Sequence, residues 1–416
     1  MLLSKSPDRF LPGGWPPYYS SARGITVTDL DGRRFQDFSL MGVGTNILGY
    51  SHRYVNARVK RVIGRSVSST LNCPEEVALG ERLLELNPWA EMVRLARTGG
   101  EANAIALRIA RVASGSSKVL VCGYHGWHDW YLAANISQSD ALNGLLLPGL
   151  SPKGVPPSMS HEIETFEYGN LNKLKRLLRG SKVGVIFMEV SRAQEADVGF
   201  LKEVRRLARK FGCVLVFDEC TSGFRAGPSG LHLEIGVEPD IATYGKALGN
   251  GFAITAVVGR RNVMEHAKGS FISSTFWSER VGPTAALATL TTMQRTNSAE
   301  KLVAIGQVIK RGWKEIADSE DLEIDIFGLD ALASFKIGSP AIQNLAKTYI
   351  TQEMLRRGYL ATTSVFVSTA HRKSKVIRYL EELSQVVRSL KTHIESESLE
   401  SALTHRQAET GFRRLN

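Results

Sequence analysis

Residues 25–38 alternate apolar and polar side chains on both sides of Asp31-Gly32, in the sequence ITVTDLDGRRFQDF. A period of two around a Gly-containing turn is typical of a β-hairpin. Between residues 75 and 260 the pattern changes, because stretches with helical periodicity alternate with short β-rich runs. The alternating pairs are LRIARVA and KVLVCGY, LKRLLRG and VGVIFMEV, and LKEVRRLARKFG and CVLVFDE. Repeated βα units predict an α/β fold with a mostly parallel sheet.

The C-terminal third has a different pattern. Helical periodicity covers residues 281–318, after which DLEIDIFG and ALASFKIG predict strands and VIRYLEELSQVVRSLKTHI predicts a helix. The predicted domains are therefore a large one over residues 61–300 and a smaller α+β one built from residues 1–60 and 301–392. Residues 393–416 are polar and charged, and we expect them to form a loosely held tail.

The composition is that of a globular protein. The chain has 416 residues, of which 43% are hydrophobic and 22% are charged, and two domains fit this length. The longest apolar runs, at 183–188 and 253–258, fall far short of the roughly 18–20 residues that span a bilayer. The start, MLLSKSPDRFLPGG, lacks a sustained apolar core and a small-residue cleavage site. A cytoplasmic protein without a membrane segment is expected.

Charge and cysteine content narrow the range of partners. The formal charge of +11 could attract phosphate-bearing or acidic molecules, but the basic residues are scattered over helical stretches. No patch of interleaved aromatic and basic residues stands out, so nucleic-acid binding is not expected. The cysteines Cys73, Cys122, Cys213 and Cys220 match neither a CxxC metal pattern nor a disulfide scaffold, and reduced thiols are expected.

Polar residues of interest follow three of the predicted strands. Ligands of open parallel sheets bind at the carboxyl ends of the strands, so these positions are candidates for a site. At the first end, Thr98-Gly99-Gly100-Glu101 leads directly into the helix NAIALRIARVA. Two glycines at a helix start leave backbone N–H groups free to bind an anion such as phosphate. The alternative is a Gly-Gly turn that only caps the helix.

Asp218 and Lys246 mark the other two ends. Asp218 follows the apolar run from Cys213 to Phe217, where a carboxylate is costly unless a cation or strong donor pairs with it. A protonated pyridine nitrogen would be such a partner, and the alternative is an Asp that caps the next turn. Lys246 lies between PDIATYG and ALGNG, whose glycines would make room for an amine in a crowded pocket. The alternative there is an ordinary solvated lysine.

The order of phosphate turn, strand-end Asp and Lys resembles that of the class III (ω-) aminotransferases. This group of fold-type I pyridoxal-phosphate enzymes includes glutamate-1-semialdehyde aminomutase. The resemblance spans roughly residues 10–385, and its motifs are DLDGRRFQDFSLMGVGTNILGYSH, TGGEANAIALRIAR, YHGW, DECTSGFR, PDIATYGKALGNGF and SSTFWSERVGPTAALATL. The stretch DECTSGFR is similar to the aminomutase branch in particular.

The resemblance implies pyridoxal 5'-phosphate as the cofactor, with a role for each matching residue. Lys246 would hold the cofactor as a Schiff base and serve as general base and acid, and Asp218 would pair with the ring nitrogen. The other implied roles are phosphate binding by Gly99 and Gly100, ring stacking by Tyr124, contact with the opposite ring face by Cys220, and a place near the ring hydroxyl for Glu189. Thr275 matches a threonine that reaches the phosphate of the neighbouring subunit, which implies a homodimer with active sites at the interface.

The implied reaction moves an amino group from a donor, with glutamate expected, to an aldehyde or ketone acceptor, as in amino-sugar or secondary-metabolite synthesis. The alternatives are an aminomutase and a non-catalytic protein on the same fold. The chain departs from the family pattern in three places. Thr98-Gly99-Gly100 lacks one hydroxyl of the usual Ser-Gly-Thr, Cys220 replaces a branched aliphatic residue, and WSER at 277–280 replaces a small Gly-Asn-Pro-type stretch. These changes predict a remodelled pocket mouth and argue against simply assigning the aminomutase reaction.

Five further polar residues each have two interpretations. His125 and His128 could relay a proton, but a structural role is expected for His125. Arg225 could bind a substrate carboxylate or fix its loop through a salt bridge. His371-Arg372 could clamp a carboxylate, although a solvated helix start is expected there.

Overall fold

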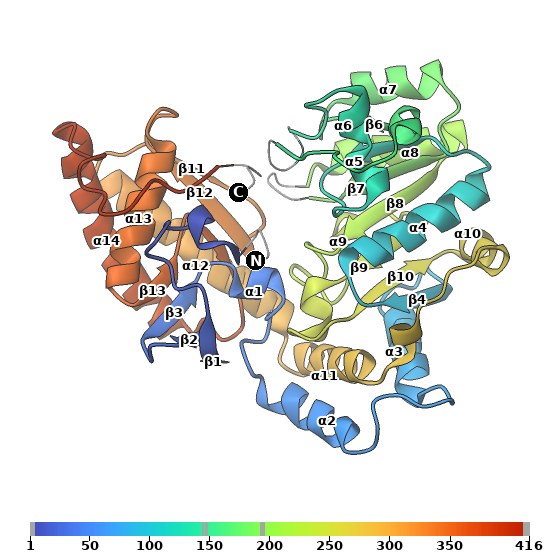
Figure 1. Ribbon diagram of the computed structural model, residues 1–416, viewed down its shortest axis with the longest axis horizontal. Helices are drawn as coiled ribbons and strands as arrows, with labels where there is room; N and C mark the ends of the chain where they lie inside the picture. Colours follow the sequence, from blue (N-terminus) through green and yellow to red (C-terminus); the bar gives the residue numbers. More distant parts are fainter. Residues whose placement is uncertain (1–4, 144, 146–148, 192–195, 411–416) are drawn as a thin grey trace. The chain divides into compact units, whose positions relative to one another are not determined.

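The computed structural model describes residues 5–143, 145, 149–191 and 196–410. The chain divides into two compact units, of which the larger is Tyr54–Gln294. The smaller combines Met1–Arg53 with Arg295–Asn416, so both ends of the chain contribute to it. The colouring along the sequence in Figure 1 shows this, because dark blue and orange-red segments share one unit and light blue to yellow segments form the other.

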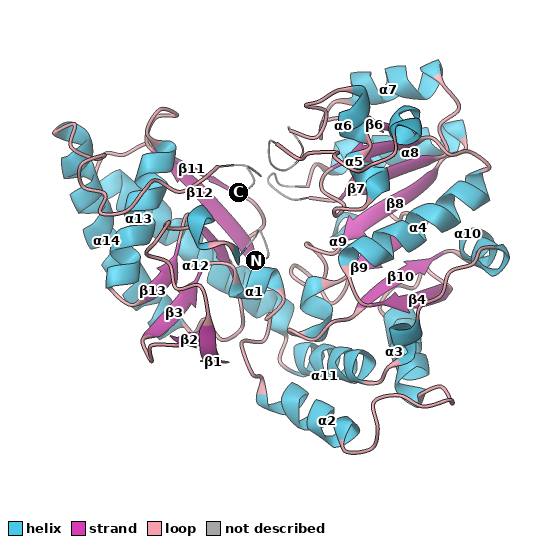
Figure 2. Ribbon diagram, in the orientation of Figure 1, coloured by secondary structure: helices cyan, strands magenta, loops and turns pink. Residues whose placement is uncertain are grey.

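A seven-stranded sheet forms the centre of the larger unit, with strand order β4-β10-β9-β8-β7-β5-β6. Strands β5 to β9 are parallel where they pair, and β10 runs antiparallel to both of its neighbours (Figure 2). The predicted mostly parallel sheet is therefore confirmed. The strands are β4 (Met92–Ala96), β5 (Val119–Cys122), β6 (Ile163–Thr165), β7 (Val185–Glu189), β8 (Val214–Glu219), β9 (Ile241–Tyr244) and β10 (Thr255–Gly259).

Helices connect and cover these strands. The α-helices are α2 (Arg53–Ile63), α3 (Pro74–Glu85), α4 (Gly99–Ser114), α5 (Asp129–Leu132), α6 (Ala134–Ser137), α7 (Leu171–Gly180), α8 (Val198–Phe211), α9 (Leu231–Ile235), α10 (Arg261–Met264) and α11 (Val281–Arg295). The 3₁₀ turns are η3 (Pro157–His161), η4 (Lys246–Gly249), η5 (Glu265–Gly269) and η6 (Thr275–Ser278). Helix α4 lies across β7 to β10, and α8 packs on β8 and α7.

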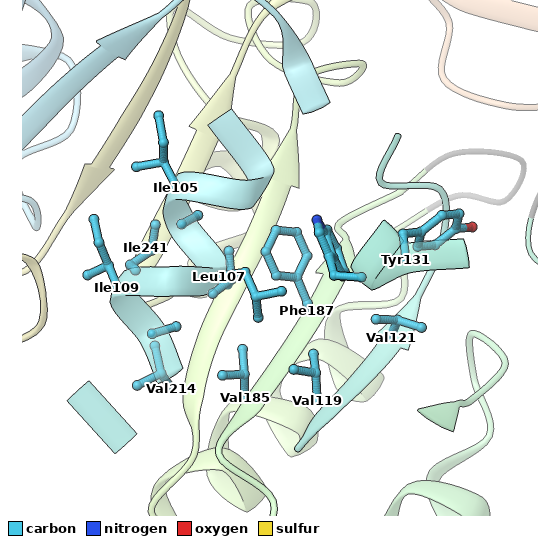
Figure 3. Packing of buried hydrophobic residues seen from close by; sticks show 14 of the residues in the cluster. Ile105, Leu107, Ile109, Val119, Val121, Tyr131, Val185, Phe187, Val214 and Ile241 are labelled. Atoms are coloured by element: carbon cyan, nitrogen blue, oxygen red, sulfur yellow. The ribbon is translucent and has the colours of Figure 1, made fainter. Parts of the chain in front are cut away.

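The main hydrophobic core lies between α4 and one face of this sheet (Figure 3). Leu107 on α4 packs into the same cluster as Val185 and Phe187 on β7. Side chains alternate between the two faces of a strand, so Ile186 and Leu215, which are also fully buried, point to the other face. Burial on both faces explains why the sequence of each central strand is a continuous apolar run.

The described residues of the smaller unit form two sheets and three long helices. Its four-stranded sheet has the order β1-β2-β3-β13, and its three-stranded sheet has the order β11-β12-β14. The predicted hairpin is confirmed, because β2 and β3 pair antiparallel and the Asp29 carboxylate accepts hydrogen bonds from the backbone of Asp31 and Arg33. The elements are η2 (Pro7–Arg9), β1 (Tyr19–Arg23), β2 (Thr26–Asp29), β3 (Arg34–Phe38), α1 (Met41–Gly44), α12 (Ser298–Ser319), β11 (Ile324–Phe327), β12 (Leu332–Ile337), α13 (Gln343–Arg356), β13 (Tyr359–Ala361), β14 (Ser364–Phe366) and α14 (Lys373–Glu395).

The expectation of a loosely held tail is wrong for the described part of the C-terminal segment. After α14 the chain packs on α13, where the backbone N–H of Ala408 donates to Thr348 Oγ1 and its carbonyl accepts from Asn344 Nδ2. Ala408 is buried, and Gln352 Nε2 donates to the carbonyl of Ala402. The polar composition of this segment gave no indication of these backbone contacts. The last six residues, 411–416, lie outside the described residues.

The expected solvated position of His371 is also wrong. The imidazole is fully buried, its Nδ1 accepts from the backbone N–H of Ser368, and its Nε2 donates to the carbonyl of Asp37. Burial lowers the pKa of His371, in keeping with a neutral ring that both donates and accepts. His371 therefore holds backbone segments together, whereas Arg372 is exposed at the start of α14. No helix among the described residues is long and apolar enough to cross a membrane.

Leu107→Ala is expected to lower the free energy of unfolding by about 2–5 kcal/mol, because it leaves a cavity between α4 and the sheet. Val112→Ala on the exposed face of the same helix is the matched control, with an expected change within about 0.5 kcal/mol. Chemical denaturation of both variants measures the difference. Equal effects would contradict the assignment of this core.

Candidate functional site

Strand register brings the candidate residues of the larger unit to one edge of its sheet. Glu189 at the end of β7 pairs with Asp218 on β8, and Asp218 in turn pairs with Thr243 on β9. Lys246 lies two residues after the end of β9. The carboxyl ends of three adjacent parallel strands therefore place two carboxylates, a hydroxyl and an amine on neighbouring segments, as expected for a ligand site in an open α/β sheet.

Asp218 is buried and held by donors from three other segments. His125 Nδ1 and Asn103 Nδ2 donate to its Oδ2 over 2.9 and 2.8 Å. The backbone N–H of Cys220 donates to its Oδ1 over 3.0 Å, and Thr243 Oγ1 lies 3.3 Å from the same oxygen. Thr243 Oγ1 also donates to Asn103 Oδ1 over 2.9 Å, which fixes the orientation of that amide. The carboxylate is thus oriented at both of its oxygens.

These contacts decide the charge of Asp218. Burial alone would raise its pKa, but the hydrogen bond and charge of His125, together with the donors of Cys220 and Asn103, outweigh burial and lower the pKa below its usual value. Asp218 is therefore ionised at neutral pH in spite of its burial. A buried carboxylate of this kind favours a positively charged group beside it.

Lys246 lies at the end of the neighbouring strand with an unusual backbone. Its Nζ donates to Thr221 Oγ1 over 2.6 Å, and its φ of 37° lies in the left-handed region that non-glycine residues seldom adopt. Such conformations cluster at functional sites, because the surrounding structure must impose them. Gly245 is needed beside it, since a Cβ there would lie 3.1 Å from Thr255 Cγ2 and 3.3 Å from Cys220 Sγ.

The predicted phosphate turn forms the start of α4. Thr98 and Glu101 make a capping box, in which Thr98 Oγ1 accepts from the Glu101 N–H and Glu101 Oε2 accepts from the Thr98 N–H. Gly99 and Gly100 are the first two residues of the helix, so helix geometry gives their N–H groups no partner within α4. A Cβ on Gly100 would lie 2.8 Å from His128 Nε2. His128 therefore lies against the turn.

Tyr124, Glu189 and Cys220 lie around the same strand ends. Glu189 Oε2 accepts from the backbone N–H of Tyr124 over 2.9 Å, and Gly123 is needed because a Cβ would lie 2.6 Å from that oxygen. Cys220 Sγ lies 3.6 Å from where a Cβ on Gly99 would be, which places the thiol beside the phosphate turn. Burial raises the pKa of the Cys220 thiol, so it stays protonated near neutral pH.

Two sequence candidates have other surroundings. Thr275 is exposed at the start of η6, and among the described residues it makes no hydrogen bond to the Asp218 cluster. Arg225 is buried, and its Nε donates to the carbonyl of Thr221 over 2.6 Å. Because Thr221 also accepts from Lys246, Arg225 fixes the loop that contacts the amine. This contact is made to a backbone carbonyl.

Three contributors to this site were absent from the sequence predictions: Asn103, Thr243 and Thr221. Asn103 interrupts the apolar face of α4 and is buried, which is a weak sequence signal for a polar contact. His125, for which a structural role was expected, donates directly to Asp218. Its Nε2 is buried and without a hydrogen-bond partner among the residues that the structure describes.

Comparisons with known proteins point to the same enzyme family as the motifs do. The family model described as aminotransferase class-III matches residues 15–403. The chain is 30% identical to the 3-aminobutyryl-CoA aminotransferase of Cloacimonas acidaminovorans over 390 residues, covering 91% of this chain and 88% of the relative. It is also 30% identical to the glutamate-1-semialdehyde 2,1-aminomutase of Methanothrix thermoacetophila over 410 residues, covering 91% and 94%. The chain therefore belongs to the class-III aminotransferases, which are pyridoxal-phosphate enzymes.

A solved structure with a similar fold is the internal aldimine form of the FumI protein from Sphingopyxis. It has a TM-score of 0.86 and 21% sequence identity, and the match covers 97% of this chain and 96% of that one. At this identity the likeness concerns the fold. It agrees with the α/β architecture and the mostly parallel sheet described above.

The residues present fit pyridoxal phosphate. An anion fits the free N–H groups at the start of α4, where the glycines allow close approach. A protonated ring nitrogen fits the ionised Asp218, and an aldehyde fits the amine of Lys246. The phosphate, the ring nitrogen and the aldehyde of the cofactor thus each have a complementary group in the larger unit.

Asn103→Leu, which removes one donor to the ionised Asp218, is expected to destabilise the protein by about 1–3 kcal/mol at pH 7. The lowered folded-state pKa means that this stabilisation is present above the usual carboxyl pKa and is lost as the pH falls through the folded value. The difference from wild type should therefore shrink in acid. Urea denaturation of the cofactor-free protein at several pH values measures it, with exposed Asn172→Leu as the control. A difference that does not change with pH would indicate lost packing instead.

Proposed function

We propose that this protein transfers an amino group from glutamate to a separate aldehyde or ketone acceptor, using pyridoxal phosphate. The observation that carries the proposal is the buried, ionised Asp218 at the strand end adjacent to the one that leads to Lys246. When bound, the cofactor supplies an electron sink for the bond that breaks at the substrate α-carbon. Burying a carboxylate in this way is costly unless a positively charged partner uses it.

The family resemblance and the positions of the residues at the strand ends support a role for each. Asp218 keeps a ring nitrogen protonated, and Lys246 Nζ carries the covalent attachment and moves a proton as base and acid. Thr221, which accepts from Lys246 Nζ, orients the amine. Gly99 and Gly100 hold the phosphate through their N–H groups. Tyr124 and Cys220 would flank the ring, and Glu189 would contact its hydroxyl side.

The segment at 277–280 supports transfer to a second molecule over the aminomutase reaction. Arg97 Nη2 donates to the carbonyls of Trp277 and Glu279, and its Nε lies 3.1 Å from Glu279 Oε1. Arg280 forms a two-contact ion pair with Glu75. Residues 277–280, which replace the small Gly-Asn-Pro-type stretch of the family, are therefore held in place within the unit. This supports a pocket shaped for a different acceptor.

An aminomutase is the second candidate. It is favoured by the Phe224-Arg225 stretch, which is similar to that branch. The chain is also as similar to an aminomutase as to an aminotransferase, with 30% identity to each. Arg225 is buried against the loop of Thr221, so the stretch supports the amine whichever reaction occurs. The two candidates differ in whether nitrogen leaves the donor molecule.

A homodimer is part of the proposal. Thr275 is exposed in the single chain, and its neighbours Phe271 and Phe276 expose 88% and 70% of their surface. Large exposed apolar patches mark interaction surfaces, and these two aromatic side chains contribute exposed apolar area to this segment. They support a contact in which Thr275 reaches the phosphate held by a second copy.

Lys246→Ala is expected to abolish the visible absorbance band of the protein incubated with pyridoxal phosphate, whereas Lys268→Ala, at an exposed lysine, keeps it. Adding glutamate to the wild type should bleach the band and release one 2-oxoglutarate per site. A band independent of Lys246 would contradict the catalytic assignment. Bleaching by an amino-aldehyde substrate that is only isomerised, with no net transfer from glutamate, would support the aminomutase.

Phe276→Glu is expected to shift the protein from dimer to monomer, because it buries a charge in the proposed interface. Sedimentation velocity at micromolar concentration measures the mass. Val198→Glu, at an exposed residue that opens α8, is the control and should leave the dimer intact. A wild-type protein that is monomeric with cofactor bound would overturn the shared-site arrangement.

A further inference from the structure

A basic cavity lies between α2 and α11 in the larger unit. Its volume is about 250 Å³, and its lining includes Arg58, Arg61, Arg65, Glu75, Arg280 and Thr284. We call it the arginine pocket. It shares no residue with the Asp218 cluster, Lys246 or the turn at the start of α4.

The arginine pocket has an excess of positive charge. Arg58, Arg61 and Arg65 follow one another at spacings of three and four residues, so they share one face of α2 and the turn after it. None of the three forms an ion pair within the described part of the chain. Arg280 is neutralised by Glu75 over 2.7 and 3.1 Å. Four guanidinium groups and one carboxylate leave a net charge of +3 around one small cavity.

Thr284 adds a second and independent observation. It is only 6% exposed, and its Oγ1 is without a hydrogen-bond partner among the described residues. Other threonines of α11 behave differently, because Thr289 and Thr291 donate to the carbonyl four residues earlier over 2.8 and 2.7 Å. A buried hydroxyl without a partner is costly, so a polar group in the cavity would complete it.

We propose that the arginine pocket binds a compact anion with two adjacent phosphate groups, at a site separate from that of the cofactor. Guanidinium groups bind phosphate oxygens through paired donors, and several of them in one cavity favour more than one phosphate. The volume lies just below the roughly 300–1,000 Å³ typical of pockets for drug-sized ligands, which favours a small ligand.

The end of a helix explains part of this arrangement. Cations are favourable near a helix C-terminus, which accounts for Arg61 and Arg65 at the end of α2. It does not account for Arg58, for the cavity, or for the hydroxyl of Thr284. The diphosphate belongs either to free pyrophosphate or to a nucleotide, and both present the same groups to the arginines.

Calorimetric titration of the protein saturated with pyridoxal phosphate tests the proposal. The probe is inorganic pyrophosphate in about 0.15 M salt, where diffuse attraction between exposed charges is screened. Arg58→Gln/Arg61→Gln is expected to weaken binding at least about tenfold, since each loses a charge-assisted contact. Thr284→Val, which keeps the shape and removes the hydroxyl, is expected to weaken it about threefold or more.

The matched control is Arg176→Gln/Arg179→Gln, which removes two exposed arginines at the same spacing on α7 and should leave binding unchanged. A second arm replaces pyrophosphate with ADP. Tighter binding of ADP assigns the diphosphate to a nucleotide, and equal or weaker binding assigns it to the free anion. The proposal is overturned if neither probe binds, or if the control double variant weakens binding as much as the pocket variant. Cofactor absorbance in the same samples tests the amino-transfer proposal separately.

Discussion

The larger unit depends on keeping one carboxylate charged inside a protein core. Asp218 is buried at the end of β8, where an unpaired charge would be prohibitive. Its donors come from α4, from the segment after β5, from β9 and from its own turn, in the form of Asn103, His125, Thr243 and the Cys220 N–H. Each donor must be held within hydrogen-bond reach, so the carboxylate constrains the position of α4 on the sheet as well as the register of β8 and β9. The contacts that keep Asp218 ionised are therefore the same contacts that position α4, β8 and β9.

The next residue on β8 shows how one strand separates two buried acids. Glu219 accepts from the backbone N–H and from Nδ1 of His232, and also from the hydroxyl of Ser222. Successive side chains of a strand point to opposite faces, so Glu219 is directed away from the face used by Asp218. Its donors bind it to the start of α9. We infer that Glu219 supports the loop between β8 and α9, while Asp218 is left for the site.

Sequence predicted those parts of the site whose signals are local. An apolar run that ends in Asp218, a lysine between glycines, and a Gly-Gly helix start can each be recognised within a few residues. The partners of Asp218 could not be recognised in this way, because Asn103 lies 115 residues away and only the folded sheet brings them together. The same limit applies to the C-terminal segment. Its polar composition indicated a loose tail, but hydrogen bonds to Thr348 and Asn344 on a distant helix hold it.

Two of the three departures from the family pattern, at residues 98–100 and 277–280, are linked through Arg97. Its backbone N–H donates to Glu101, the residue that caps α4 together with Thr98, and its side chain holds the carbonyls of Trp277 and Glu279. Glu279 in turn accepts from the first N–H groups of α11. The turn proposed to bind one phosphate is thus tied to the segment that follows Thr275. If Thr275 reaches the phosphate of a second copy, a change at 277–280 alters both phosphate contacts together. Substitutions at 277–280 would then change cofactor affinity and dimer assembly together.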